Sequence, residues 1–181
     1  MIQEIYQTAI KYAGTQHQDQ KVPGSNANYL LHLSNVAMEV MMAHHATPDF
    51  DLAYAIQLAI LHDTIEDTSS TFLEIQELFG DEVAEGVQAL TKDESLPTKE
   101  EQMLGSVQRI NALRKEVGLV KLADRITNLQ KPPAHWSIEK IKKYLLEAEM
   151  LSTRLANKNP YLNKRLVEKI GEYRKYVNSN N

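Results

Sequence analysis

The strongest constraint on the fold is an apolar segment that ends in a cluster of ionisable side chains. Residues 52–61 are apolar except for Tyr54 and Gln57, so a helix here is apolar on nearly every side and belongs in the protein interior. One imidazole and three carboxylates follow it directly: His62, Asp63, Glu66 and Asp67. Buried carboxylates need compensation. We therefore expect a divalent cation at this helix end, where the negative end of the helix dipole adds to the attraction.

Helical periodicity covers most of the chain, and no segment alternates for long in the manner of a strand. The predicted helices span residues 1–17, 29–45, 49–62, 71–79, 81–91, 98–115, 118–130, 137–157 and 161–177. The chain is therefore all-α. Its 181 residues suffice for one domain with a substantial core. We expect that domain over residues 1–177, with a frayed polar tail at 178–181.

The composition excludes several classes of protein. No apolar run is long enough to span a membrane, and the N-terminus lacks the order of a signal peptide, so we expect a cytoplasmic protein without a membrane partner. A formal charge of −4 argues against binding nucleic acid. The absence of cysteine restricts a metal site to His, Asp and Glu ligands. An apolar stripe around Leu145 and Leu151 belongs either to the core or to a homo-oligomer interface.

Two further segments carry polar side chains beside apolar stripes. His32 lies at the edge of an apolar stripe, where a lone histidine is more often a satisfied core residue than a ligand. Over residues 118–130 the helical period separates an apolar stripe from a polar one, which consists of Lys121, Asp124, Arg125 and Asn128. Alone, this polar stripe favours an ordinary solvated face with a local ion pair. The acids after His62 have a similar alternative, a solvated turn at the end of a helix.

Together the three segments give the order His, His-Asp, Asp, and here the chain resembles the HD-domain metal-dependent phosphohydrolases. Within them it is most similar to the hydrolase domain of RelA/SpoT proteins and to the stand-alone small alarmone hydrolases, which remove the 3′-pyrophosphate from ppGpp. The resemblance covers about residues 4–165. It includes residues 17–20, 29–32, 61–68, 79–83, 90–93, 95–97, 120–125, 128–129 and 136–137. The resemblance implies an HD-domain helical bundle.

The resemblance also implies a role for each matching residue. One divalent metal, usually Mn²⁺ in this family, would be held by His32, His62, Asp63 and Asp124. The same ligand types also suit Fe²⁺, Co²⁺ and Zn²⁺. Glu66 and Asp67 match the acidic pair that orients or deprotonates the attacking water and handles the leaving-group proton. The expected substrate contacts are Lys121, Arg125 and Asn128, and residues 95–97 correspond to a loop over the site.

The chain departs from the family pattern at residues 20–24, at residues 28–33, which lack two prolines of the family, and at Gln130, where an Arg is common. Alarmone hydrolases carry a basic Arg-Lys pair after the His-x-x-Gln motif, whereas residues 20–24 contain Lys21 as their only base. We expect Lys21 to contact the substrate and His17 to order the loop before it. Because nucleotide contacts set the discrimination between related substrates, the reaction type is better specified than the substrate. The alternatives are another small nucleotide, such as ppApp or NADPH, and a degenerate HD domain that only senses a nucleotide.

Overall fold

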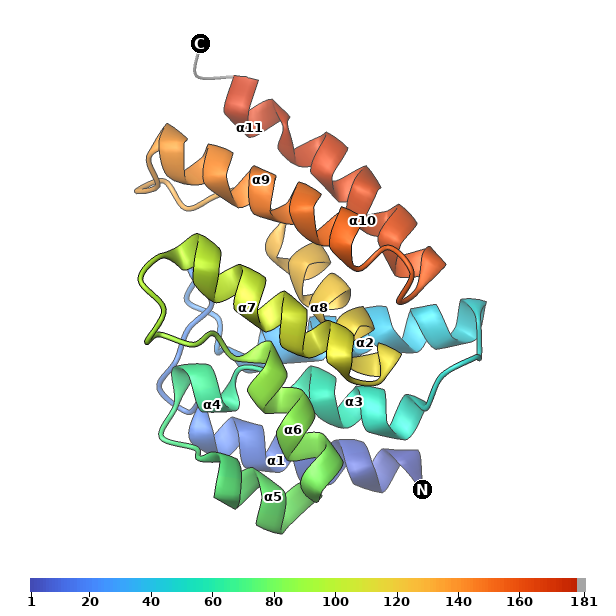
Figure 1. The fold of residues 1–181 in the computed structure, drawn as a ribbon. Helices are drawn as coiled ribbons and strands as arrows, with labels where there is room; N and C mark the ends of the chain where they lie inside the picture. The colour runs from blue at the N-terminus through green and yellow to red at the C-terminus, as the bar shows by residue number, and fades with distance from the viewer. Residues whose placement is uncertain (179–181) are drawn as a thin grey trace.

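The computed structural model describes residues 1–178, and these form helices joined by short loops (Figure 1). The helices are α1 (Ile2–Gln16), α2 (Leu30–Ala46), α3 (Leu52–Leu61), α4 (Thr64–Asp67), α5 (Phe72–Phe79), α6 (Asp81–Leu90), α7 (Lys99–Ala112), α8 (Lys115–Asn128), α9 (Ile138–Arg154), α10 (Pro160–Tyr173) and α11 (Lys175–Asn178). The described residues contain no strand beyond an isolated bridge between Lys21 and Asn28. The all-α prediction is confirmed. Residues 179–181 of the predicted tail lie outside the described residues.

Helix α3 lies at the centre of the bundle, as its apolar sequence predicts. Its N-cap is Asp51, whose carboxylate accepts a hydrogen bond from the backbone N–H of Tyr54. Helices α1, α2, α6 and α8 pack around it, and Leu58, Ile60 and Leu61 have no exposed surface. Burying each such side chain contributes about 1.5–3 kcal/mol. The C-terminal end of α3 therefore opens inside the protein.

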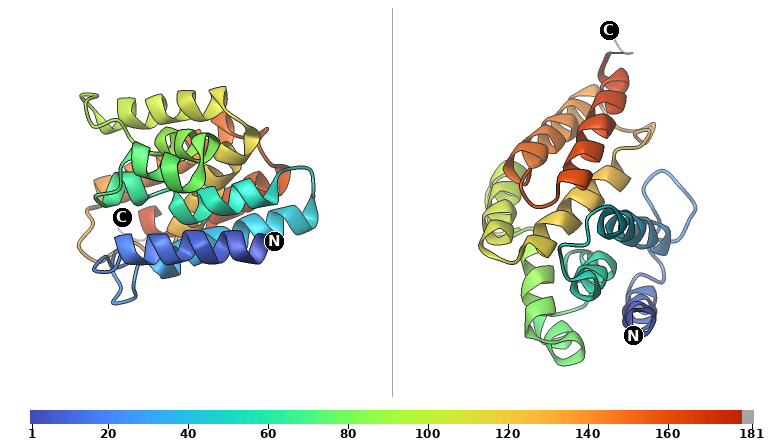
Figure 2. Two further views of the ribbon diagram at one scale, coloured as in Figure 1. Left: turned by 90° about the horizontal axis from the view of Figure 1, so that it is seen from below. Right: turned by 90° about the vertical axis from the view of Figure 1, so that its right-hand side faces the viewer.

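The remaining helices form two outer groups (Figure 2). Helices α9 and α10 lie side by side at one end of the molecule and pack against α8, while α5 and α6 pair at the other end. Helices α3 and α8 lie between these groups. None of the described helices is both long enough and apolar enough to cross a membrane.

The predicted boundaries are wrong in three places. The break expected between residues 115 and 118 lies at Leu113 and Arg114, and α8 runs through Gly118. A side chain at Gly118 would approach Lys158 Cγ to 2.5 Å, so this glycine allows close packing and does not end a helix. The helix expected over residues 161–177 is interrupted at Arg174, between α10 and α11. Finally, residues 64–67 form the additional short helix α4, in which the backbone N–H of Asp67 donates to Asp63 O and that of Thr68 donates to Thr64 O.

Two helical glycines provide a matched test of this packing. A Cβ at Gly86 would lie 2.6 Å from Leu58 Cδ2 and 2.8 Å from Tyr54 Oη, whereas no described atom lies within 4 Å of a Cβ at Gly171. We expect Gly86→Ala to lower the free energy of unfolding by about 1–3 kcal/mol, because a filled core resists an added methyl group. Gly171→Ala should raise it by about 0.5–1 kcal/mol through helix propensity. Urea unfolding followed by circular dichroism measures both, and equal changes would contradict this packing.

Candidate metal centre

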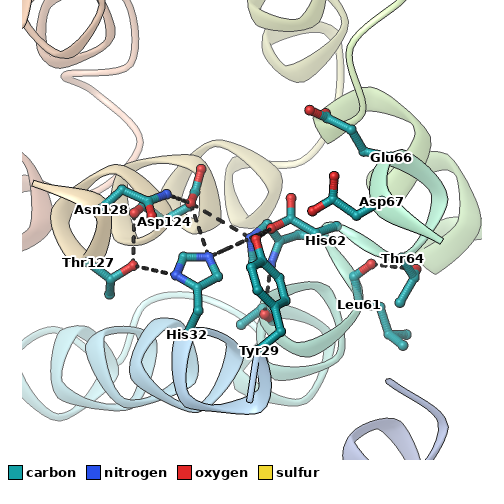
Figure 3. Close-up of polar contacts among 12 residues, drawn as sticks. Tyr29, His32, Leu61, His62, Thr64, Glu66, Asp67, Asp124, Thr127 and Asn128 are labelled. Atoms are coloured by element: carbon teal, nitrogen blue, oxygen red, sulfur yellow. Dashed lines mark hydrogen bonds and ion pairs between the residues drawn. The ribbon is translucent and has the colours of Figure 1, made fainter. Parts of the chain in front are cut away.

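Three helices bring two imidazoles and a carboxylate to one buried point (Figure 3). His32 comes from α2, His62 follows the last residue of α3, and Asp124 comes from α8. The two Nε2 atoms are 3.3 Å apart, and Asp124 Oδ1 lies 3.4 Å from His32 Nε2 and 3.8 Å from His62 Nε2. The three residues are 5%, 1% and 6% exposed. Their candidate ligand atoms all lie within 4.8 Å of one another.

Asp63 lies beside this group. Its Oδ2 is 3.0 Å from His62 Nε2 and 3.7 Å from His32 Nε2. The same oxygen accepts a 2.5 Å hydrogen bond from the hydroxyl of Tyr29, a residue that the sequence motif contained but to which no role was assigned. The structure thus brings together all four residues predicted as ligands.

Hydrogen bonds on the far side of each ring determine which imidazole nitrogens face the centre. His62 Nδ1 lies 2.9 Å from Ala59 O, which can only accept, so Nδ1 carries the proton. His32 Nδ1 lies 3.2 Å from Thr127 Oγ1, whose own proton goes to Asp124 O. When both rings are neutral, each therefore directs an Nε2 lone pair toward the same point. Such an arrangement suits a cation, and this polar support of the outer nitrogens is typical of metal-ligating histidines.

The electrostatics of the centre also favour a cation. Burial lowers the pKa of His62, but the carboxylates of Asp63 and Asp124 outweigh it and raise that pKa to about 10. Burial raises the pKa of Asp124, and the nearby Lys121 and histidines hold it well below its usual range. Without a metal the centre thus retains a proton between ring and carboxylates. A divalent ion can replace that proton, since metal binding requires deprotonated ligands.

The acidic pair lies on α4, next to the centre (Figure 3). Glu66 accepts from Lys92 at both oxygens, from the backbone N–H at 2.9 Å and from Nζ at 2.5 Å. Asp67 accepts from Gln20 Nε2 at 2.9 Å. Burial, together with the charge of Asp63, raises the pKa of Asp67. The two neighbouring carboxylates are therefore held differently, one by a cation and one by a neutral amide.

Three of the four residues in the predicted polar stripe of α8 are buried, and only Asn128, at its end, is exposed. The solvated-face interpretation is therefore wrong for Lys121, Asp124 and Arg125. Lys121 and Arg125 are 5% and 4% exposed. Lys121 Nζ lies 3.2 Å from Asp124 Oδ2, and Asn128 Nδ2 donates to Asp124 Oδ1 at 2.5 Å. The guanidinium of Arg125 lies 4.1 Å from the ring centre of Tyr144, and its Nη2 bonds Glu147. Its Nε and Nη1 are buried and have no hydrogen-bond partner among the described residues.

Two cavities adjoin the centre. The smaller one, about 170 Å³, is lined by five carboxylates (Asp63, Glu66, Asp67, Asp124 and Glu147), by three cations (Lys92, Lys121 and Arg125), and by Tyr29, Met103, Asn128 and Tyr144. The larger one, about 360 Å³, has walls from residues 22–25 and 130–133, with His32, Asn35, Asn128, Trp136, Tyr144 and Tyr173 among its lining. Asn128 and Tyr144 belong to both linings. The smaller cavity is therefore lined mainly by charged side chains, and the larger one is partly aromatic.

Some predicted residues lie away from these cavities. Lys21 is exposed and lines neither of them, although the residues after it do. Residues 95–97 also line neither, and Gln102 Nε2 holds that loop through Leu96 O. In contrast, sequence reasoning assigned no site role to Gln20, Lys92, Thr127 and Tyr144. Gln20 and Lys92 lie in segments that resemble the family, so the motif contained them, but only the folded chain shows what they contact.

The fold and the centre define the class: the chain belongs to the HD-domain family, whose profile matches residues 9–161. An HD domain implies a divalent metal, and the buried His/His/Asp group accords with this. The resemblance found in the sequence is therefore confirmed.

Among particular relatives, a Danio rerio protein named guanosine-3′,5′-bis(diphosphate) 3′-pyrophosphohydrolase MESH1 is 32% identical over 164 residues, which cover 88% of each chain. An Aquifex aeolicus protein named guanosine-3′,5′-bis(diphosphate) 3′-pyrophosphohydrolase is 36% identical over 70% of this chain and 18% of its own length. A solved structure, described as a metazoan ortholog of SpoT that hydrolyses ppGpp, has a TM-score of 0.79 and 25% identity. That match covers 93% of this chain and 94% of the other.

Proposed function

We propose that this protein hydrolyses a 3′-pyrophosphorylated purine nucleotide of the ppGpp type and releases pyrophosphate. The observation that carries the proposal is the meeting of His32, His62, Asp63 and Asp124 beside the acidic pair of α4. Relatives named for this activity match nearly the whole chain. The sensor alternative is less well supported, because a domain that only binds nucleotide has no chemical need for an acidic pair beside a set of metal ligands.

His32, His62, Asp63 and Asp124 would hold one divalent metal. Two imidazoles and two carboxylates suit Mn²⁺, and they also suit Fe²⁺, Co²⁺ and Zn²⁺. The facing Nε2 atoms support this assignment, since two lone pairs 3.3 Å apart repel unless a proton or a metal cation lies between them. When bound, such a metal supplies Lewis acidity that polarises a phosphoryl oxygen and lowers the pKa of water.

The two acids of α4 are suited to different tasks. The raised pKa of Asp67 fits a carboxyl group that takes the proton of the attacking water and later gives it to the leaving oxygen. Glu66, with both oxygens bound by Lys92, is suited to orient that water as a fixed acceptor. In this reaction the water oxygen forms a bond to the phosphorus that carries the 3′ oxygen of the ribose. The bond between this phosphorus and the 3′ oxygen breaks, and the proton taken from water ends on the 3′ oxygen as the hydroxyl group.

Substrate phosphates would lie against the cations of the smaller cavity. Arg125 has two buried nitrogens without partners among the described residues, Nε and Nη1, and an anionic oxygen would accept from their N–H groups. Lys121 supplies a second positive charge, and Asn128 can donate at the junction of the two cavities. The aromatic lining of the larger cavity, including Trp136 and Tyr144, suits the planar base of a nucleotide.

A second candidate substrate is a related nucleotide such as ppApp or NADPH. The altered loop favours it, because Lys21 is its only base and is exposed. A small-molecule nucleotide is the partner in either case. The cytoplasmic location, the lack of a nucleic-acid partner and homo-oligomer formation stay predictions from the sequence.

The ligand assignment predicts the effect of removing single ligands. His62→Ala and Asp124→Ala should each lose both the metal and the activity, because the remaining groups no longer enclose the ion, while the helical fold persists. Elemental analysis and circular dichroism measure these properties. The exposed His45 provides the control, since His45→Ala should keep both metal and activity. Full metal occupancy in the two ligand variants would show that the assignment is wrong.

The acidic pair predicts a loss of turnover without a loss of metal. Glu66→Gln should keep the metal and lower kcat by about two decades or more, the size expected when the attacking water is no longer correctly oriented. Steady-state kinetics with metal-saturated protein measure kcat, and the exposed Glu77→Gln serves as the matched control. Unchanged turnover in Glu66→Gln would remove this residue from the mechanism.

The altered loop predicts a changed substrate preference. Each charged hydrogen bond lost to a phosphate should cost about 1.5–3 kcal/mol, which is roughly one to two decades in affinity. We therefore expect ppGpp to show a high KM or to be a poorer substrate than ppApp, and Lys21→Ala to weaken binding further. The measurement is kcat/KM for both nucleotides, with Lys11→Ala as control. Efficient ppGpp hydrolysis at micromolar KM, unaffected by Lys21→Ala, would exclude the loop from the binding site.

A further inference from the structure

The turn between α1 and α2 contacts the acidic pair through the side-chain amide of Gln20. Gln20 Nε2 donates to Asp67 Oδ2 at 2.9 Å. The backbone of Gln20 is held on both sides, since its N–H donates to His17 O and its carbonyl accepts from the N–H of Tyr29, both at 3.0 Å. With the main chain held in this way, the direction in which the amide points depends on its side-chain contacts.

His17 makes the second contact of that amide. Its Nδ1 lies 2.5 Å from Gln20 Oε1, a carbonyl oxygen that can only accept, so Nδ1 carries a proton. The ring is 1% exposed, and burial lowers the pKa of His17, which favours the neutral form with one proton. The other nitrogen, Nε2, is buried without a partner in the described part of the chain, consistent with its carrying no proton. The hydrogen bonds thus run in one direction, from His17 through Gln20 to Asp67.

The direction of these hydrogen bonds decides whether the nitrogen or the oxygen of the Gln20 amide faces Asp67. A terminal amide can turn over and exchange its oxygen and nitrogen. With the oxygen toward Asp67, two acceptors would oppose each other and the carboxylate would lose its donor. The N–H of His17 prevents this, because it requires an oxygen on its own side of Gln20.

We propose that His17 and Gln20 are positioning residues that hold the carboxylate of Asp67 for proton transfer, with His17 acting only through the amide of Gln20. This inference rests on the proposed function, since Asp67 is the group that receives the proton of water. It assigns a role to two residues that line neither of the two cavities and act on a carboxylate that does.

The hydrogen bond of His17 can be separated from its packing. Its ring also stacks against Tyr29, with ring centres 5.0 Å apart, and Tyr29 in turn donates to Asp63. His17→Phe keeps a ring against Tyr29 and removes the N–H. His17→Asn removes the ring and keeps an N–H donor, Nδ2, which is bonded to Cγ as Nδ1 is in histidine. If packing were the purpose of His17, the phenylalanine variant would be the milder one.

The kinetic test compares these variants with Gln20→Met, which keeps the length of the side chain without the amide. We expect Gln20→Met and His17→Phe each to lower kcat about tenfold, the effect of one lost hydrogen bond, with KM and metal content within about twofold of the original. His17→Asn should recover most of the loss. The double variant should be no slower than Gln20→Met alone, because residues that act in series are not additive. The exposed Gln18→Met is the control.

A measurement without substrate separates this inference from the proposed function. In Zn²⁺-loaded protein at neutral pH, nitrogen NMR of the imidazoles should show the proton of His17 on Nδ1, and Gln20→Met should shift it toward Nε2. A proton on Nε2 in the unaltered protein, unchanged kcat in His17→Phe, or additive losses in the double variant would each overturn the inference. If no nucleotide is hydrolysed, the proposed function fails. The hydrogen bonds from His17 through Gln20 to Asp67 are still supported if the proton of His17 lies on Nδ1 and moves toward Nε2 in Gln20→Met.

Discussion

The burial of the C-terminal end of α3 is the constraint on which the site depends. Because α3 is surrounded by α1, α2, α6 and α8, the residue that follows it, His62, must find its polar partners inside the protein. It finds them on α2 and α8, the same helices that cover α3. Apolar packing thereby sets the separations between His32, His62 and Asp124, and a shift of any of these helices would separate the groups.

Charge balance in the smaller cavity follows from the same burial. Five carboxylates and three cations line it, so with neutral imidazoles the carboxylates exceed the cations by two, the charge of one divalent ion. Each cation lies beside a particular acid: Lys92 beside Glu66, Lys121 beside Asp124 and Arg125 beside Glu147. Buried ion pairs of this kind give little net stability. Their value here is that a phosphate can meet positive charges already held in place.

The supporting contacts form a layer outside the proposed ligands. Tyr29 donates to Asp63, Thr127 orients His32, and Gln20 holds Asp67. Such contacts fix the direction of lone pairs, and the direction decides whether a buried group attracts a metal or repels it. Sequence reasoning assigned none of these three a site role, because a tyrosine, a threonine and a glutamine are too common in helices and turns to carry a signal by themselves.

The sequence by itself determined the helical class, the interior position of the apolar segment 52–61 and the residues of the candidate centre, because these depend on local periodicity and on short motifs in three separated segments that resemble a known family. It did not determine that Lys121 and Arg125 are buried, since a polar helical stripe looks the same whether it faces water or another helix. It also could not place Lys21 or the break at Leu113, because loop direction and helix ends depend on distant contacts. Only the tertiary structure, by packing α9 over α8 and the turn of residues 17–29 against α4, decided which polar groups meet.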